Sequence, residues 1–137
     1  MPDDTLASLL RLRQHQVNLA QRDLADRQAA AAQAQDALTA IATRLRAEMD
    51  GPATPGLGIG AWLARSARDG AAAAQRAALA EQAVAAARET LFEHRARQKL
   101  AEIMQARRAA EARRQALRKE QITLSDLALR PRKSVIT

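Results

Sequence analysis

Residues 51–60 read GPATPGLGIG, and this stretch divides the chain into two parts of unequal length. It holds four of the five glycines and two of the four prolines. Proline removes a backbone donor and glycine lowers helix propensity, so we expect no helix to run through this segment. The stretch therefore predicts a loop between two helices.

On the N-terminal side of this loop, apolar residues recur every seven positions. We predict a helix over about residues 3–49, which Asp3 or Asp4 can cap. A second column, three residues further on, is mixed and contains Arg13 and Arg27. An unbroken seven-residue column is typical of a coiled coil. Its members are Leu10, Val17, Leu24, Ala31, Leu38 and Leu45.

The composition agrees with long helices and a thin core. The chain has 137 residues, of which 35 are alanine, one is Trp, one is Phe and none is Tyr or Cys. Such a mixture is typical of a coiled coil in a single domain, here residues 1–137. The start, MPDDTLAS, has neither the basic nor the apolar part of a signal peptide, and no apolar run is long enough for a transmembrane segment. We therefore expect a cytoplasmic protein.

After a loop over about residues 50–58, we predict a second helix over about residues 59–129, which Pro131 ends, and a basic tail over 130–137. Two long helices joined by a short loop form an antiparallel hairpin most economically. The predicted fold is all-α: an elongated antiparallel two-helix coiled-coil hairpin with a longer, overhanging second helix. Residue i should then face about residue 110 − i, so that the second helix extends past the first from near Gln105. The expected pairs are Leu6 with Ile103, Val17 with Phe92, Leu24 with Ala85, and Ala31 and Ala34 with Ala74 and Ala78.

The excess positive charge lies in the last third of the chain, where residues 95–137 hold twelve basic and four acidic side chains. Apolar residues recur within this segment at heptad spacing, in one arc of a helix with arginines on its flanks. We interpret the arc as a coiled-coil seam that continues past the end of the first helix and needs a partner. Trp62, just after the loop, is either a cover for the hairpin tip or an interface anchor. The other candidate partner-binding residues are Ile103, Arg107, Ala110, Arg113, Arg114, Leu117, Arg118 and Leu124.

No motif predicts catalysis, a cofactor or a metal site. GPATPGLGIG lacks the Lys-Ser/Thr pair of a phosphate-binding loop, and no carboxylate completes a ligand set with His15 and His94, which we expect to be solvated on the surface. The basic segment has no aromatic residue for base stacking, and its apolar face is half alanine, unlike a membrane-surface helix. A basic coiled-coil protein associated with nucleic acid and an architectural homo-oligomer stay open as alternatives.

Three short stretches are GIGAWL at residues 58–63, EHRARQKL at 93–100 and SDLALR at 125–130. They resemble stretches of the FliJ family, the coiled-coil components of the flagellar type III export apparatus. The likeness extends over nearly the whole chain, in architecture more than in identity. Family members are antiparallel helical hairpins with a glycine-containing loop, in keeping with the fold expected here.

The resemblance implies a non-enzymatic adaptor in motility and protein transport. FliJ-like proteins bind the hexameric export ATPase, promote its assembly or activity, contact the cytoplasmic domain of the export gate and help to handle export chaperones. The implied location is the cytoplasm, in peripheral association with the inner-membrane export apparatus, and no specific nucleic acid is implied. Injectisome-type secretion systems have similarly built stalk proteins, and this alternative also stays open.

Overall fold

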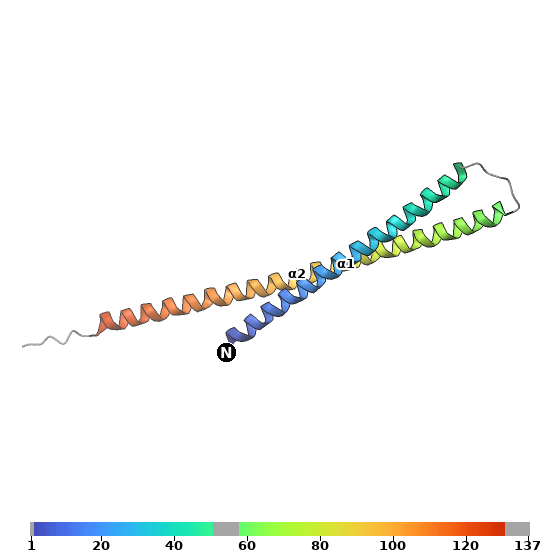
Figure 1. Ribbon diagram of the computed structural model, residues 1–137. Helices are drawn as coiled ribbons and strands as arrows, with labels where there is room; N and C mark the ends of the chain where they lie inside the picture. Colours follow the sequence, from blue (N-terminus) through green and yellow to red (C-terminus); the bar gives the residue numbers. More distant parts are fainter. Residues whose placement is uncertain (1, 51–57, 131–137) are drawn as a thin grey trace, which may run out of the picture.

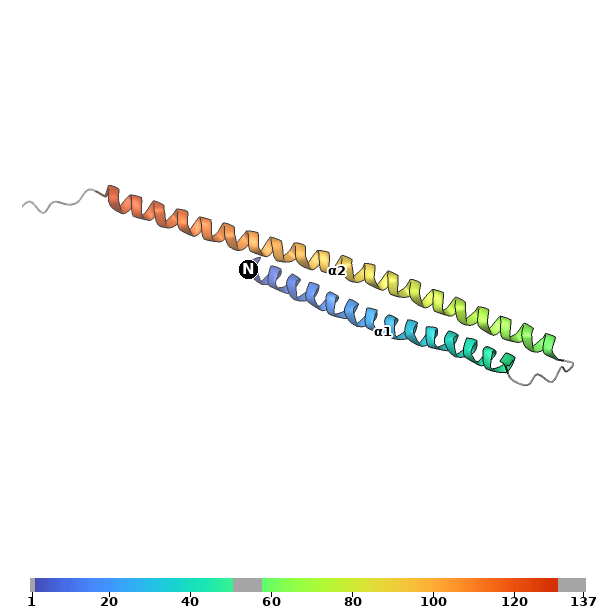
Figure 2. The same cartoon turned by 90° about the horizontal axis from the view of Figure 1, so that it is seen from above.

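The computed structural model describes residues 2–50 and 58–130, and these ranges form two helices and no strand. Helix α1 (Pro2–Asp50) and helix α2 (Ile59–Leu129) run antiparallel, and α2 extends far beyond the start of α1 (Figures 1 and 2). The predicted all-α hairpin with a longer second helix is confirmed. The predicted first helix is one residue shorter than α1 at each end, and the second has the same bounds as α2. The predicted loop, apart from its ends, and the basic tail beyond Arg130 lie outside the described residues.

Both ends of α2 follow from local backbone chemistry. Gly58 precedes the helix at φ 152°, a conformation that residues with a side chain rarely adopt. Its carbonyl oxygen accepts a hydrogen bond of 2.9 Å from the backbone N–H of Trp62. At the other end, Arg130 is extended, with ψ 121°, and its N–H donates to the Asp126 carbonyl at 3.0 Å. Arg130 precedes Pro131, and the residue before a proline is driven out of the helical region.

Helix α1 contacts α2 through the predicted heptad column. Val17 and Ala31 are buried, and the other four members of that column are half-buried. The mixed second column contributes buried Leu6 and Ala20, whereas Arg27 stays exposed. We call this row of buried and half-buried residues between the two helices the seam.

On α2 the seam is lined mainly by small side chains. Its buried members are Ala73, Ala77, Val84, Ala87, Leu91 and Ala101. Figure 1 shows the helices crossing along their paired length, whereas Figure 2 shows them side by side from the perpendicular direction. Alanines let two backbones approach closely but remove little apolar area from water, so the free energy of pairing depends on a few larger residues. Val17, Ala20 and Leu91 form the central cluster, with Leu24 against it.

The predicted pairings gave the right height along the hairpin but the wrong face of α2. Leu91, only 6% exposed, packs with Val17, whereas Phe92 is 74% exposed. The predicted partner of Val17 is therefore wrong by one residue. One residue along a helix is a rise of about 1.5 Å but a turn of about 100°, so counting from the loop does not choose the face. The same displacement makes Ala73 and Ala77, not Ala74 and Ala78, the buried pair, and leaves Ala85 exposed beside Val84.

Candidate partner-binding site

The C-terminal part of α2 extends beyond the start of α1 (Figure 2). Leu6, near the start of α1, lines a cleft with Gln105, Arg108, Ala109 and Ala112. Every residue from 111 to 129 is exposed, and we call this segment the overhang. It begins several residues later than predicted, because Leu6 in the first turns of α1 still lines a cleft with α2 residues that extends to Ala112, in the first turn of the overhang. At 1.5 Å per residue it projects about 27 Å (Figure 2).

Four of the candidate residues form an apolar row along α2. Ile103, Leu117 and Leu124 are exposed and Ala110 is half-buried. These four lie at strict heptad spacing, and we call them the outer column. Leu100, also exposed, lies within about 60° of Ile103 around the helix and widens the column where it begins.

The outer column does not continue the seam, and this expectation is wrong. Counting heptads onward from buried Ala101 gives Arg108, Gln115, Ile122 and Leu129, a mixed row that contains no member of the outer column. Ile103 lies two residues beyond Ala101, a turn of about 200°, and therefore on the opposite side of α2. A partner on the outer column would accordingly lie across α2 from α1.

The arginines chosen from the sequence are all exposed. Arg113 donates through Nε to the Ala109 carbonyl at 3.4 Å, and Arg114 Nη1 lies 3.8 Å from Glu111 Oε2. Arg107 and Arg118 take part in none of the salt bridges found between described residues. Exposed helix pairs of this kind contribute little to stability, so these guanidinium groups can engage an acidic partner at low cost.

Trp62 belongs to a different part of the molecule. It is half-buried in the first turn of α2, about 60 Å along the helix from Ile103. The hairpin tip and the outer column are therefore separate surfaces. Because Trp62 is half-buried, it agrees with both predicted roles: a cover for the hairpin tip, or an interface anchor whose exposed side contacts a partner.

His94 is not the solvated surface residue that we expected. It is half-buried in the seam, and its Nδ1 is buried with no hydrogen-bond partner among the described residues. Polar neighbours continue the seam here: Gln98 donates to Gln14 Oε1 across the two helices, and Arg13 Nη1 donates to Gln16 Oε1 at 3.1 Å. His94 stands seven residues from both Ala87 and Ala101, and this spacing was the signal in the sequence. His15, in contrast, is exposed as expected.

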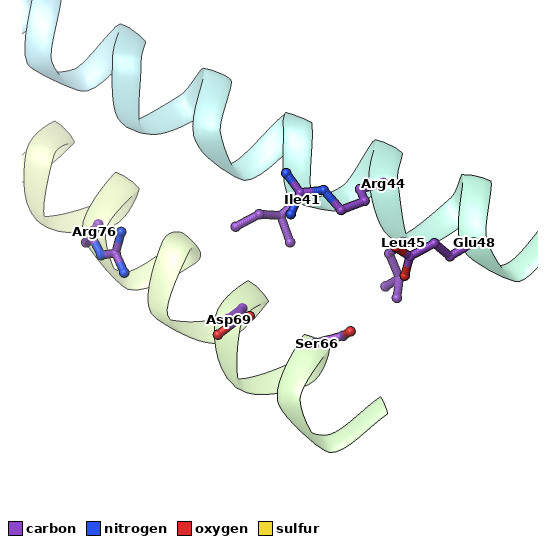
Figure 3. Close-up of a pocket in the computed structure, with 7 residues that line it drawn as sticks. All are labelled: Ile41, Arg44, Leu45, Glu48, Ser66, Asp69 and Arg76. Carbon is purple, nitrogen blue, oxygen red and sulfur yellow. The ribbon is translucent and has the colours of Figure 1, made fainter. Parts of the chain in front are cut away.

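Toward the loop, the helices leave an open cleft between them (Figure 3). Ile41 and Leu45 extend from α1 toward α2 in this view. The cleft holds about 210 Å³, below the roughly 300–1,000 Å³ typical of small-molecule sites. Two arginines and two carboxylates line it together, so it has no net charge to select a ligand. Its lining residues are Ile41, Arg44, Leu45, Glu48, Ser66, Asp69 and Arg76.

Within the described ranges, no three His, Cys, Asp or Glu side chains come together as metal ligands. Neither α1 nor α2 is apolar enough over a sufficient length to cross a membrane. What the structure brings together is thus one long apolar row with basic flanks on α2.

Comparisons of the chain with protein-family models, with curated proteins and with solved structures find no match.

Proposed function

We propose that this chain is a FliJ-like, non-enzymatic adaptor of a type III protein export apparatus, and that its main partner is the hexameric export ATPase. The observation that carries the proposal is the exposed overhang, with Leu117 and Leu124 on one face and arginines beside them. The hairpin architecture and the three short stretches that resemble the FliJ family support it further.

The proposed mechanism is mechanical and electrostatic. Helix α2 is continuous from Ile59 to Leu129, so it can act as a stiff rod that α1 supports over most of its length and leaves free in the overhang. Its outer column supplies the apolar contact, and the arginines steer an acidic partner surface into place. Bound in this way, the adaptor promotes assembly or activity of the ATPase without chemistry of its own.

The same proposal includes two further contacts. The cytoplasmic domain of the export gate would meet the first part of α2 and the hairpin tip at Trp62, and export chaperones would be handled at the same apparatus. The chain would then work in the cytoplasm, peripherally associated with the inner-membrane export apparatus. The flagellar and injectisome forms of this role predict the same surfaces.

The test is a pull-down of the chain by purified flagellar export ATPase, with an injectisome ATPase as a parallel bait. We expect wild-type chain to be retained by one of them and the variant Leu117→Asp plus Leu124→Asp to be lost. Ile122→Asp is the matched control, because Ile122 has nearly the same exposure as Leu117, 61% against 59%, but lies on the face with Arg108 and Gln115. Circular dichroism should give the same helix content for all three, because the changed side chains are exposed.

Two results would count against the proposal. Failure of wild-type chain to bind either ATPase rejects the function. Equal retention of the double variant rejects the surface. The nucleic-acid alternative would be favoured if the chain bound duplex DNA with an affinity that falls steeply with salt and is the same in wild type and in the double leucine variant.

A further inference from the structure

Helix α2 carries two rows of different character on opposite sides. The inner row faces α1, and its buried members are small or apolar as far as Ala101, with half-buried His94 and Gln98 between Leu91 and Ala101. Beyond the start of α1 it becomes mixed: Gln115, Lys119 and Asp126 are polar and Ile122 and Leu129 are apolar, all of them exposed. The outer column has no charged member over the same length, so it offers a second helix the better apolar surface.

The outer column is apolar over three heptads, from Ile103 to Leu124, a length of about 32 Å. It starts while α1 is still present on the other side, since Ala101 is buried against α1 and Ile103 follows two residues later. Leu100 extends the apolar surface further into the paired region. A helix bound to the outer column would therefore lie beside the last paired turns of the hairpin. It would not take the place of α1 along the overhang alone.

The charges beside the outer column have one dominant sign. Arg107, Arg114 and Arg118 lie on one side of it, and Arg113 with Glu120 on the other. The only nearby ion pair that the described residues form is the exposed contact between Arg114 and Glu111. The residues flanking a heptad column set partner choice through charge, so this pattern selects acidic flanks on the opposing helix.

From these observations we infer that the outer column docks an amphipathic partner helix with acidic flanks, on the side of α2 opposite α1 and overlapping the hairpin. Helix α2 then becomes the middle element of a staggered three-helix assembly. The inference rests on the proposed adaptor role but not on the identity of the ATPase. A second copy of this chain is disfavoured as the occupant, because its own overhang would bring arginines against arginines.

A synthetic peptide tests this directly. The probe has about four heptads, leucine or isoleucine in the two core positions and glutamate at the flanking positions; its control carries lysine in place of each glutamate. Binding to the full chain is measured by calorimetry. We expect the acidic peptide to bind and the basic peptide not to bind. Leu117→Asp plus Leu124→Asp should weaken binding by about tenfold or more, and Arg107→Glu plus Arg118→Glu by a similar factor.

Matched changes on the inner row test whether the peptide binds the outer column specifically or binds the overhang nonspecifically. Ile122→Asp alters an equally exposed residue of the overhang, and Arg108→Glu plus Lys119→Glu removes the same charge from the inner row. Both variants should bind the acidic peptide within about threefold of wild type.

Three results would overturn the inference. The first is equal loss of binding in the inner-row and outer-column variants. The second is binding that depends on Arg107 and Arg118 but not on the leucines, which would mean that charge alone attracts the peptide. The third is a solution mass that shows a dimer of wild-type chain and a monomer of the double leucine variant, since the outer column would then be covered by a second copy. The peptide experiment does not use the ATPase. It can therefore support the inference even if the ATPase pull-down is negative.

Discussion

Ala101 and Ile103 are two residues apart on α2 and face opposite ways, since Ala101 is 3% exposed in the seam and Ile103 is 39% exposed on the outer side. A turn of about 200° separates them. The two positions thus mark where pairing with α1 and the proposed docking surface coexist on one helix.

An aspartate at each position should have different effects. Ala101→Asp places a charge in the seam, and we expect the free energy of unfolding to fall by about 2 kcal/mol. Ile103→Asp should change it by less than about 0.5 kcal/mol, because the side chain already faces solvent. Urea denaturation followed by circular dichroism measures both. Equal destabilisation by the two changes would mean that Ile103 also packs against α1.

Leu91 and Phe92 offer a second neighbouring pair for the centre of the hairpin. Leu91→Ala removes the largest member of the cluster with Val17 and Ala20, and we expect a loss of about 2 kcal/mol in the free energy of unfolding. Phe92→Ala should cost less than about 0.5 kcal/mol, since that ring is 74% exposed. Thermal unfolding of the two variants compares them, and a larger effect of Phe92→Ala would restore the pairing of Val17 with Phe92.

The sequence predicted the parts of this fold that depend on strong local signals. The glycine- and proline-rich loop set the helix ends, and the leucine column of α1 set the face that α1 turns inward. The face of α2 gave no comparable signal, because alanine occupies inner and outer positions alike: Ala71–Ala74 includes both. Choosing between inner and outer positions requires the direction of each residue around the helix axis as well as its position along the axis. A count of residues from the loop gives only the position along the axis.

The candidate site shows the same division. Exposure of the arginines and leucines of the overhang followed from the lengths of the two helices, which the loop position sets. That these leucines lie across α2 from α1 did not follow, because a heptad column looks the same whichever side of the helix it occupies. The burial of His94 was not predicted because histidine is not an apolar residue, although His94 follows Ala87 by one heptad in the sequence.

His94 provides a test of the polar part of the seam. Replacing it with leucine removes a buried nitrogen that has no hydrogen-bond partner among the described residues and adds apolar contact with α1. We expect His94→Leu to raise the free energy of unfolding by about 1 kcal/mol. The control is His15→Leu at the exposed histidine of α1, which should have almost no effect.

A polar residue in a coiled-coil core also fixes which positions face each other, at some cost in stability. The contact of Gln98 with Gln14 lies about one turn further along α2. Cross-linking of cysteines introduced at these two positions should therefore be efficient in the wild-type background and weaker when His94 is leucine. Unchanged stability together with unchanged cross-linking in His94→Leu would show that His94 has no part in the pairing.

The last prediction concerns Gly70 and the stability of α2. It lies within α2, and a Cβ built at this position meets no atom within 4 Å. Gly70→Ala should therefore raise the free energy of unfolding by about 0.5–1 kcal/mol, because alanine loses less backbone entropy in a helix. Gly58→Ala is the contrasting change: space is again free, but the φ of 152° is strained for alanine, so stability should fall and the start of α2 should fray. Hydrogen exchange of the first turns of α2 separates the two, and faster exchange in Gly70→Ala than in wild type would contradict the prediction.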